Sequence, residues 1–351
     1  MLFRSILITV FGILFSHNIL ALMNTKDELI DGAVLYLRIY LLGMPALGLY
    51  NFGNAVLSAA GDTKRPLYYL AFAGVVNVIL NLFFVIVCHL GVAGVALASM
   101  ISQFISAFLI LRALLTGKEK YCLRLSEIRF DRRKAAGILQ IGIPSAFQYS
   151  LFAFANLFVQ SSVNSFDHVL VEGNSAAANA DPLVYDMMAA FYTACSSFIA
   201  QNFGAKKKKR ILQTYLICLF YSFITSLVLG IGLYLARYPF LYLFTSDKAV
   251  VEAGITRLSI MALSYSASAF MDASIAASRG LGKTAVPTFV VVMGSCVFRI
   301  IWIYTIFAYF HTIQSLYILY VFSWGITAIA ENIYFFHVYR HTLTGKTESH
   351  L

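Results

Sequence analysis

The most informative feature of this chain is a series of long apolar stretches separated by short polar segments. Most stretches could cross the hydrocarbon core of a bilayer as an α-helix, which takes about 20 residues. The runs are continuous rather than alternating, so membrane β-strands are a poor alternative. The pattern predicts an all-α polytopic membrane protein with ten helices at 5–22, 33–58, 67–88, 92–114, 139–163, 175–203, 211–236, 254–279, 287–309 and 315–338.

The 26 lysine and arginine residues are divided unequally between the two sets of helix ends. With the N-terminus in the cytoplasm, 20 lie at cytoplasmic ends, Arg299 lies within a helix, and five lie at outer ends: Lys26, Arg38, Arg237, Lys248 and Arg257. Short cytoplasmic segments of membrane proteins are enriched in these cations. We therefore expect a multi-pass membrane protein with both termini cytoplasmic.

The composition favours lipid as the solvent and argues against several other classes of protein. The chain is 60% hydrophobic and only 12% charged, about half the usual charged fraction of a soluble domain. The net charge of +10 arises from cytoplasmic segments, so nucleic acid is not an expected partner. The five cysteines lack the spacing of a zinc site or a disulfide framework. Catalytic motifs are not found either, so we expect neither an enzyme nor a metal or cofactor.

The chain also repeats itself at an offset of 221 residues. The turn Gly61–Pro66 aligns with Gly282–Pro287, Asn51 aligns with Asp272, and helix boundaries match. Because the second half begins near residue 139, the first half lacks about 83 residues of the repeat, equivalent to two helices and the start of a third. We expect ten of twelve helices in two parallel halves, as in many transporters.

These observations define the expected domains. They are a partial N-terminal lobe of four helices, a basic cytoplasmic linker, a C-terminal lobe of six helices and a cytoplasmic tail, at 1–114, 115–137, 138–340 and 341–351.

Five groups of segments resemble the multidrug and toxic compound extrusion (MATE) family, and within it the DinF-like bacterial branch. They cover essentially the whole chain in family order, and together they form a specific signal. The segments are Tyr36–Pro45 with Gly61–Pro66, Gly91–Ala98 with Ile101–Gln103, Ile141–Pro144 with Gln160–Asn164, Val171–Asn174 with Gln201–Gly204, and Ser278–Gly282.

The resemblance implies a two-lobe helix bundle of the MOP/MATE type in a bacterial inner (plasma) membrane. It also implies export of cationic, amphipathic compounds driven by entry of sodium or protons, with acidic residues inside the membrane coupling ion to drug. One family acid lies on a first helix that this sequence lacks, so it cannot be carried over. Another aligns near Ser268, about one turn from Asp272.

Charged residues at membrane depth are costly and usually paired or functional. Four are expected there: Asp186, Asp272, Arg299 and Glu331. Asp272 and Arg299 lie at similar depth on consecutive helices. This placement predicts an ion pair, a cation or proton site at Asp272, or an ion pair that is exchanged for a bound ion during transport. Asp186 lacks a partner nearby in the sequence and could pair with Arg299 instead. Glu331 lies nearer the cytoplasmic end, where it could reach water.

Neutral and aromatic side chains supply further candidates for the pathway. Asn51 and Asn156 are polar residues inside predicted helices, as are Asn77 and Asn81. A subset of aromatic residues could line a cavity that holds aromatic cations. These are Phe147, Tyr149, Phe152, Phe154 and Tyr192.

Together these observations predict a monomeric antiporter, coupled to Na⁺ or H⁺, that exports cationic amphipathic molecules by alternating access. Two alternatives stay open. One is a flippase for lipid-linked precursors from the same superfamily, which would need a basic cavity. The predicted helices instead contain one cation at membrane depth, Arg299, and three acids, and this balance of charge favours cationic substrates. The other is a non-transporting truncated remnant, or a partial sequence of a longer protein.

Overall fold

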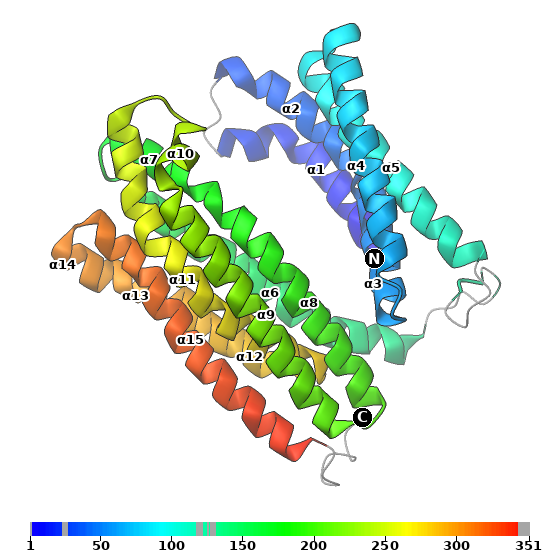
Figure 1. Ribbon diagram of the computed structural model, residues 1–351. Helices are drawn as coiled ribbons and strands as arrows, with labels where there is room; N and C mark the ends of the chain where they lie inside the picture. The colour runs from blue at the N-terminus through cyan, green and yellow to red at the C-terminus, as the bar shows by residue number, and fades with distance from the viewer. Residues whose placement is uncertain (1, 23–26, 117–121, 125, 127–130, 343–351) are drawn as a thin grey trace. The chain divides into compact units, whose positions relative to one another are not determined.

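The computed structural model describes the chain except residues 1, 23–26, 117–121, 125, 127–130 and 343–351 (Figure 1). It divides into two compact units, Met1–Arg129 and Phe130–Leu351. Part of the predicted linker 115–137 and most of the predicted tail 341–351 fall outside the described residues, and α6 already begins at Arg132. These domain boundaries therefore stay predictions.

The first unit is a small helical bundle built around α5. Its helices are α1 Leu2–Leu22, α2 Asp27–Leu42, α3 Met44–Ala59, α4 Lys64–Leu82 with its π-helical continuation η1 Phe83–Val87, and α5 Gly91–Thr116. Helix α5 contacts α2, α3 and α4. Its buried Ile110 and Leu114 pack with Leu57 and Tyr50 of α3. The Tyr50 hydroxyl donates to the Pro66 carbonyl at 2.9 Å and so ties α3 to α4.

The predicted span 33–58 is broken in the structure. Helices α2 and α3 meet at Gly43 with a bend of 43°. Pro45 lies in the first turn of α3, where the missing N–H costs little, but its ring prevents the helix from running through from α2. A hydrophobic pattern does not reveal this break, because apolar residues continue across it.

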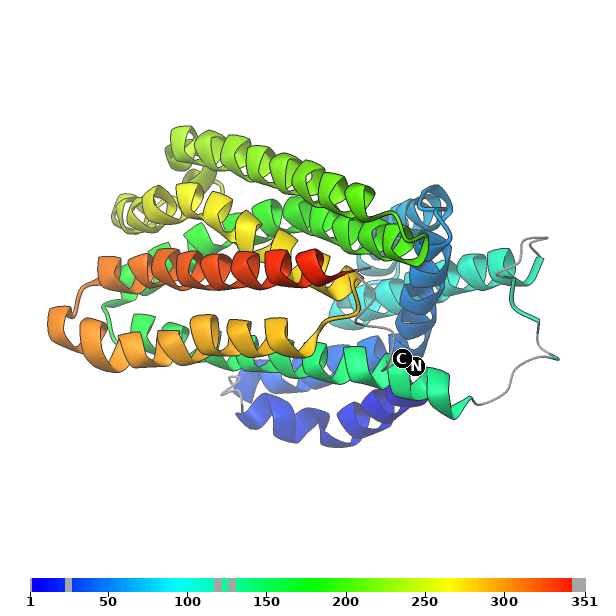
Figure 2. The same ribbon diagram turned by 90° about the horizontal axis from the view of Figure 1, so that it is seen from below.

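The second unit is a larger bundle arranged around α11. Its elements are α6 Arg132–Val163, α7 His168–Ala178, α8 Ala180–Gly204, α9 Lys208–Leu235, α10 Arg237–Tyr242, α11 Lys248–Gly280, α12 Ala285–Val291, η3 Val292–Val297, α13 Phe298–Trp302, η4 Ile303–Phe307, α14 Ala308–Phe310 and α15 Ile313–His341. Helix α11 contacts α7, α8, α9 and α15. Figure 2 shows α15 beside the 285–310 span, consistent with its contacts to α12, η3 and α13.

The internal repeat is confirmed at its most distinctive turn. Gly61 and Gly282, which are 221 positions apart, both have positive φ, of 92° and 76°. After α3, the amides of Gly61 and Asp62 donate to Ser58 and Leu57. After α11, the amides of Gly282 and Lys283 donate to the equivalent carbonyls of Arg279 and Ser278. Both helices thus end in the same glycine-dependent hydrogen-bond pattern.

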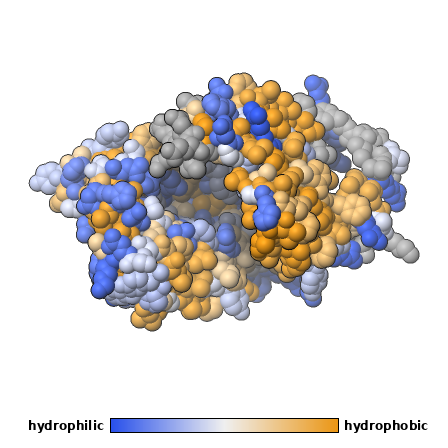
Figure 3. All heavy atoms as spheres, turned by 90° about the horizontal axis from the view of Figure 1, so that it is seen from above, coloured by the Kyte–Doolittle hydropathy of each residue, from blue (hydrophilic) through white to orange (hydrophobic). Residues whose placement is uncertain are grey.

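The helices bury and expose apolar side chains as a lipid solvent requires. Within its most apolar window, α11 is 67% buried, whereas the α4–η1 span is only 6% buried. Leu70, Val75 and Ile79 of α4 therefore present apolar surface outward. Figure 3 shows broad apolar patches of this kind on the face it presents. Among the described helices, eight are long and apolar enough to cross a membrane, or nine if α2 and α3 form one bent span.

The predicted helix positions agree with the structure, since each of the ten ranges coincides with described helix. The count of ten stays a prediction, because the described part of the first helix falls below the length of a full span. One predicted loop is wrong. The segment 164–174, between the predicted spans 139–163 and 175–203, contains the start of α7, where Asp167 caps the helix and Glu172 lies within it. A short helix of mixed polarity gives no spanning signal, so the hydrophobic pattern missed it.

Candidate functional site

A cavity of about 610 Å³ lies inside the second unit. Its walls come from α6, α7, α8, α11, α12, α13 and α15. Aromatic side chains supply much of the surface, and five charged side chains line the same space: Asp181, Arg257, Asp272, Arg279 and Arg299. A volume of this size accommodates a small organic molecule.

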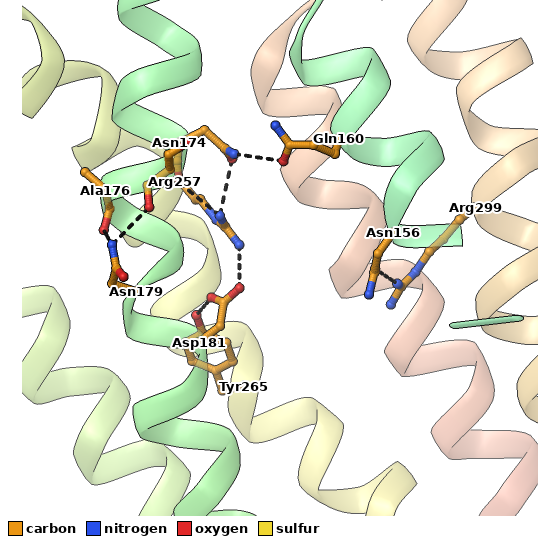
Figure 4. Close-up of polar contacts among 10 residues, drawn as sticks. Asn156, Gln160, Asn174, Ala176, Asn179, Asp181, Arg257, Tyr265 and Arg299 are labelled. Carbon is orange, nitrogen blue, oxygen red and sulfur yellow. Dashed lines mark hydrogen bonds and ion pairs between the residues drawn. The ribbon is translucent and has the colours of Figure 1, made fainter. Parts of the chain in front are cut away.

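One group of charges in the cavity is an ion pair between α8 and α11 (Figure 4). Nη2 of Arg257 lies 2.6 Å from Oδ2 of Asp181, and their side chains are only 8% and 28% exposed. The Tyr265 hydroxyl donates to the second Asp181 oxygen. Nη1 of Arg257 donates to the backbone and side-chain oxygens of Asn174, at 3.1 and 3.3 Å. Both charges are therefore balanced and held in a fixed geometry.

Arg299 is the second charged feature, and it is 1% exposed. Its Nη1 donates to Oδ1 of Asn156 on α6 at 2.9 Å, as Figure 4 shows, and its Nε donates to Oγ of Ser323 at 3.3 Å. The rings of Phe152 and Tyr320 lie 4.9 and 4.5 Å from the guanidinium carbon. Both hydrogen-bond partners are neutral. Within the described part of the chain, Nη2 has no acceptor.

Local helix geometry sets the position of Arg299. The preceding segment η3 is π-helical, which widens the turn just before α13 and shifts the face that Arg299 presents. A Cβ at Gly294 in η3 would meet Thr327 of α15, so a glycine is needed for this approach. The hydroxyls of Ser295 and Thr327 then join the two segments at 3.0 Å.

Arg279 and Asp272 form the third charged region, and both lie on α11. Nη2 of Arg279 donates to Oε1 of Gln148 on α6 at 2.8 Å, and Thr288 donates to the same oxygen at 3.3 Å. Asp272 is half-buried. Its carboxylate makes no hydrogen bond or ion pair within the part of the chain that the structure covers. It is thus a free carboxylate facing a cavity that also contains aromatic rings.

Three of the six predicted site residues meet in this cavity: Asp272, Arg299 and Asn156. The predicted Asp272–Arg299 ion pair is wrong, because Arg299 reaches toward α6 and α15 rather than toward α11. Asp186 does not pair with Arg299 either. It lies five residues from Asp181, about 140° around the helix, and it is exposed outside the cavity.

Two further predicted residues lie elsewhere. Glu331 is fully buried, so the expectation that it reaches water is wrong, and neither carboxylate oxygen has a partner in the described structure. Asn51 belongs to the first unit, where it is exposed on α3. Of the five predicted cavity aromatics, Tyr149, Phe152 and Tyr192 line the cavity, whereas Phe147 and Phe154 do not.

Sequence reasoning missed Asp181, Arg257 and Arg279 as cavity residues. The charge distribution assigns Arg257 and Arg279 to helix ends, and the residues expected at membrane depth do not include Asp181. A signal was available, because Asp181 lies inside the predicted span 175–203 and Arg257 inside 254–279. Opposite charges inside two spans are expected to pair. The predicted balance of one deep cation against three acids is therefore wrong for this cavity, which three arginines and two aspartates line.

Comparison with known proteins identifies the family that shares this architecture. The MatE family model matches residues 1–83 and 144–305. The probable multidrug resistance protein YpnP of Bacillus subtilis is 33% identical over 201 residues, which are 57% of this chain and 44% of that protein. A FAD transporter of Shewanella oneidensis is 25% identical over 247 residues, which are 69% of this chain and 54% of that protein. The chain thus spans about half the length of these curated relatives.

Solved structures share the fold. A MOP superfamily transporter from Pyrococcus furiosus superposes with a TM-score of 0.91 at 20% identity, covering 97% of this chain and 77% of that one. An outward-facing multidrug resistance MATE family transporter gives a TM-score of 0.91 at 21% identity, covering the same shares. The family match, over more than half of the residues, and the helical fold with its apolar spans lead to one conclusion: this chain is a multi-pass membrane protein that belongs to the MatE family.

Proposed function

We propose that this chain is an ion-coupled antiporter that exports amphipathic aromatic molecules by alternating access. The observation that carries the proposal is the cavity of about 610 Å³ inside the second unit, where aromatic rings and unpaired polar groups face one space. Ligand sites of transporters commonly lie near the bilayer midplane between helices of such bundles. Several relatives are described as probable multidrug resistance proteins, which supports efflux.

Asp272 is the residue that we assign to ion coupling. A carboxylate without a hydrogen bond or an ion pair in a partly buried cavity binds H⁺ or Na⁺ favourably, because either one offsets the cost of the buried charge. A cationic substrate group would compete for the same carboxylate. Entry of the ion and exit of the substrate would then be linked through a single site. The preference for cationic substrates, predicted from the sequence, rests on this residue.

A second candidate function is supported by the arginines. Arg257, Arg279 and Arg299 make the cavity more basic than the sequence suggested. A basic cavity suits a flippase for lipid-linked anionic precursors, the alternative within the same superfamily. Arg257 is neutralised by Asp181, however, so only part of this positive charge is free to meet a substrate. We therefore keep efflux of small molecules as the leading proposal.

Efflux in proteoliposomes tests the leading proposal. A fluorescent amphipathic dye is loaded, and proton and sodium gradients are imposed separately. We expect one gradient to drive dye movement in the parent chain and Asp272→Asn to abolish that dependence. Glu252→Gln is the matched control, because Glu252 is an exposed acid on the same helix, outside the cavity. Gradient-driven efflux that survives in Asp272→Asn at the parent rate would remove Asp272 from the mechanism.

The orientation, assembly state and family branch belong to the proposal too. We place both termini in the cytoplasm of a bacterial inner-membrane protein that works as a monomer of the DinF-like branch. The distribution of lysine and arginine supports the orientation. Labelling from either side of the membrane tests it, with single cysteines placed at Lys206 and at Lys248. The first should react from the cytoplasm and the second from outside.

A further inference from the structure

Arg299 carries a buried positive charge for which the structure supplies no neighbouring counter-charge. Its side chain is 1% exposed, and its two hydrogen-bond acceptors, Asn156 and Ser323, are neutral. Burying an unpaired guanidinium costs several kcal/mol. The free N–H groups of Nη2 leave it able to accept an anionic partner. Such a residue lining a cavity indicates that a ligand supplies the missing negative charge.

The other cavity charges do not fill this role. Asp181 is committed to Arg257 and Tyr265. Asp272 lies on α11, seven residues before Arg279 and about 10 Å from it along the helix axis, and neither described hydrogen bond of Arg299 reaches it. Glu331 is eight residues beyond Ser323 on α15, about 12 Å along the axis, and it does not line the cavity. One positive charge, that of Arg299, is left over.

The surroundings of Arg299 also define the rest of the ligand. Phe152 and Tyr320 lie on the guanidinium, so their rings cover its flat surface and leave the N–H edge for hydrogen bonding. Trp324 continues the aromatic surface, with its ring centre 5.5 Å from that of Tyr320. Both residues line the cavity. A ligand whose anionic group meets the N–H edge would therefore rest an aromatic body on these rings.

We propose that Arg299 forms an anion subsite, which takes one carboxylate or phosphate group carried by an aromatic substrate. That this substrate is transported rests on the proposed export function. That the anion binds at Arg299 rests on the geometry of this residue alone. The subsite and Asp272 lie in one cavity, so a zwitterionic substrate, with its anionic group at Arg299 and its cationic group at Asp272, fits the two groups together.

Three probes with one ring system and different charge test the proposal. They are anthracene carboxylate, anthracenemethanol and (aminomethyl)anthracene, and their binding to the purified full chain is followed by fluorescence anisotropy. We expect the carboxylate to bind at least about tenfold more tightly than the neutral alcohol, as for a buried charge pair with Arg. Equal binding of the carboxylate and the alcohol, or no binding of the carboxylate to folded protein, overturns the subsite.

Two variants remove the subsite in different ways. Arg299→Gln deletes the charge. Asn156→Asp keeps the shape of its side chain and places a carboxylate where Arg299 already donates. Both should lower carboxylate affinity by about tenfold or more without weakening the alcohol. Asn156→Asp keeps the test valid if Arg299→Gln fails to fold. Unchanged carboxylate affinity in a folded Asn156→Asp chain also overturns the proposal.

Arg237→Gln is the matched control. Arg237 is likewise stacked on two rings, those of Tyr234 and Tyr238 at 4.5 and 5.7 Å, but it lies outside the cavity. Its loss should leave carboxylate binding unchanged. An equal loss in this variant would show that general positive charge is responsible and would contradict a subsite at Arg299.

Competition with phosphatidic acid in mixed micelles distinguishes the source of the anion. Displacement of the anthracene carboxylate from the parent chain assigns the subsite to a lipid headgroup. Persistence of binding assigns it to a soluble aromatic anion. Both outcomes support the anion subsite, but displacement by the lipid contradicts an aromatic substrate and persistence supports one. The anion subsite and the transport function can fail separately. If the binding test fails, dye efflux can still be measured. If the anion binds but no gradient drives efflux, the subsite stands and the transport proposal is removed.

Discussion

Nη2 of Arg257 on α11 lies 2.6 Å from Oδ2 of Asp181 on α8, and both residues line the cavity of the second unit. Tyr265 donates to the other oxygen of Asp181, so the carboxylate holds two side chains of α11 at once. Helices α8 and α11 are therefore fixed to each other by a polar contact. In a membrane, such contacts stabilise helix packing without the usual hydrophobic driving force.

Removing Asp181 should destabilise the second unit. Asp181→Asn leaves Arg257 buried without a negative partner, and we expect a loss of about 2–4 kcal/mol. Thermal unfolding in detergent measures the effect. Glu252→Gln serves as control, because its only described hydrogen bond is an exposed one from Tyr238 at 3.4 Å. A melting temperature for Asp181→Asn equal to that of the control would contradict the structural role of the pair.

Gly230 should be intolerant of any side chain. A Cβ at this position would meet the backbone oxygen of Ala262, so α9 would be forced away from α11. We expect Gly230→Ala to cost about 1–3 kcal/mol, as for overpacking. Gly232→Ala on the same helix is the control, since nothing lies within 4 Å of its Cβ. Alanine favours a helix, so the control should be neutral or slightly stabilised. Equal melting temperatures for both variants would argue against close α9–α11 packing.

The repeated turn predicts a pair of equivalent effects. Gly61 and Gly282 have open space around their Cβ positions, yet both have positive φ. Gly61→Ala and Gly282→Ala should each destabilise by about 1 kcal/mol, since alanine adopts this conformation with strain. Gly204 also has open space but an ordinary φ, so Gly204→Ala should not destabilise. Thermal unfolding of all three variants compares them, and a destabilised Gly204→Ala would point to loss of space rather than to backbone strain.

Glu331 should be replaceable without loss of stability. Its carboxyl group is fully buried, and both oxygens lack partners within the described residues. Exchanging a buried, unpaired polar group for an apolar one of similar size removes a desolvation cost. We expect Glu331→Met to raise the melting temperature. If stability falls markedly instead, Glu331 has a partner, such as a bound cation, and chelator or sodium titrations of the parent chain would identify it.

The sequence predicted the helices well because lipid imposes a simple requirement on them. A spanning helix must be apolar for about 20 residues, and this leaves a readable pattern around residues such as Leu70 and Val75 of α4. The break at Gly43 was not visible, because apolar residues continue through it and the bend depends on Pro45. The hydrophobic pattern shows which segments are suited to lipid, but it does not show where the backbone of a helix bends.

The site was only partly predictable for a similar reason. The sequence singled out Asp272 and Arg299, both of which line the cavity, because charged residues within apolar runs are easily seen. Their pairing depended on the direction in which each side chain points. The π-helical segment η3 shifts the face that Arg299 presents, so its partner is Asn156 rather than Asp272. The ion pair of Arg257 with Asp181 was missed although both residues lie inside predicted spans, because counting Arg257 among the cations of the outer helix ends ignored this signal.

The most direct test of the account asks whether a transported aromatic molecule sits in the cavity of the second unit. The chain has two tryptophans, of which Trp324 lines the cavity and Trp302 does not. A nitroaromatic substrate analogue that quenches by contact is titrated into the purified chain and into Trp324→Phe and Trp302→Phe. We expect saturable quenching in the parent and in Trp302→Phe, and its loss in Trp324→Phe. Saturable quenching that persists in Trp324→Phe would place the substrate away from this cavity and contradict the central claim.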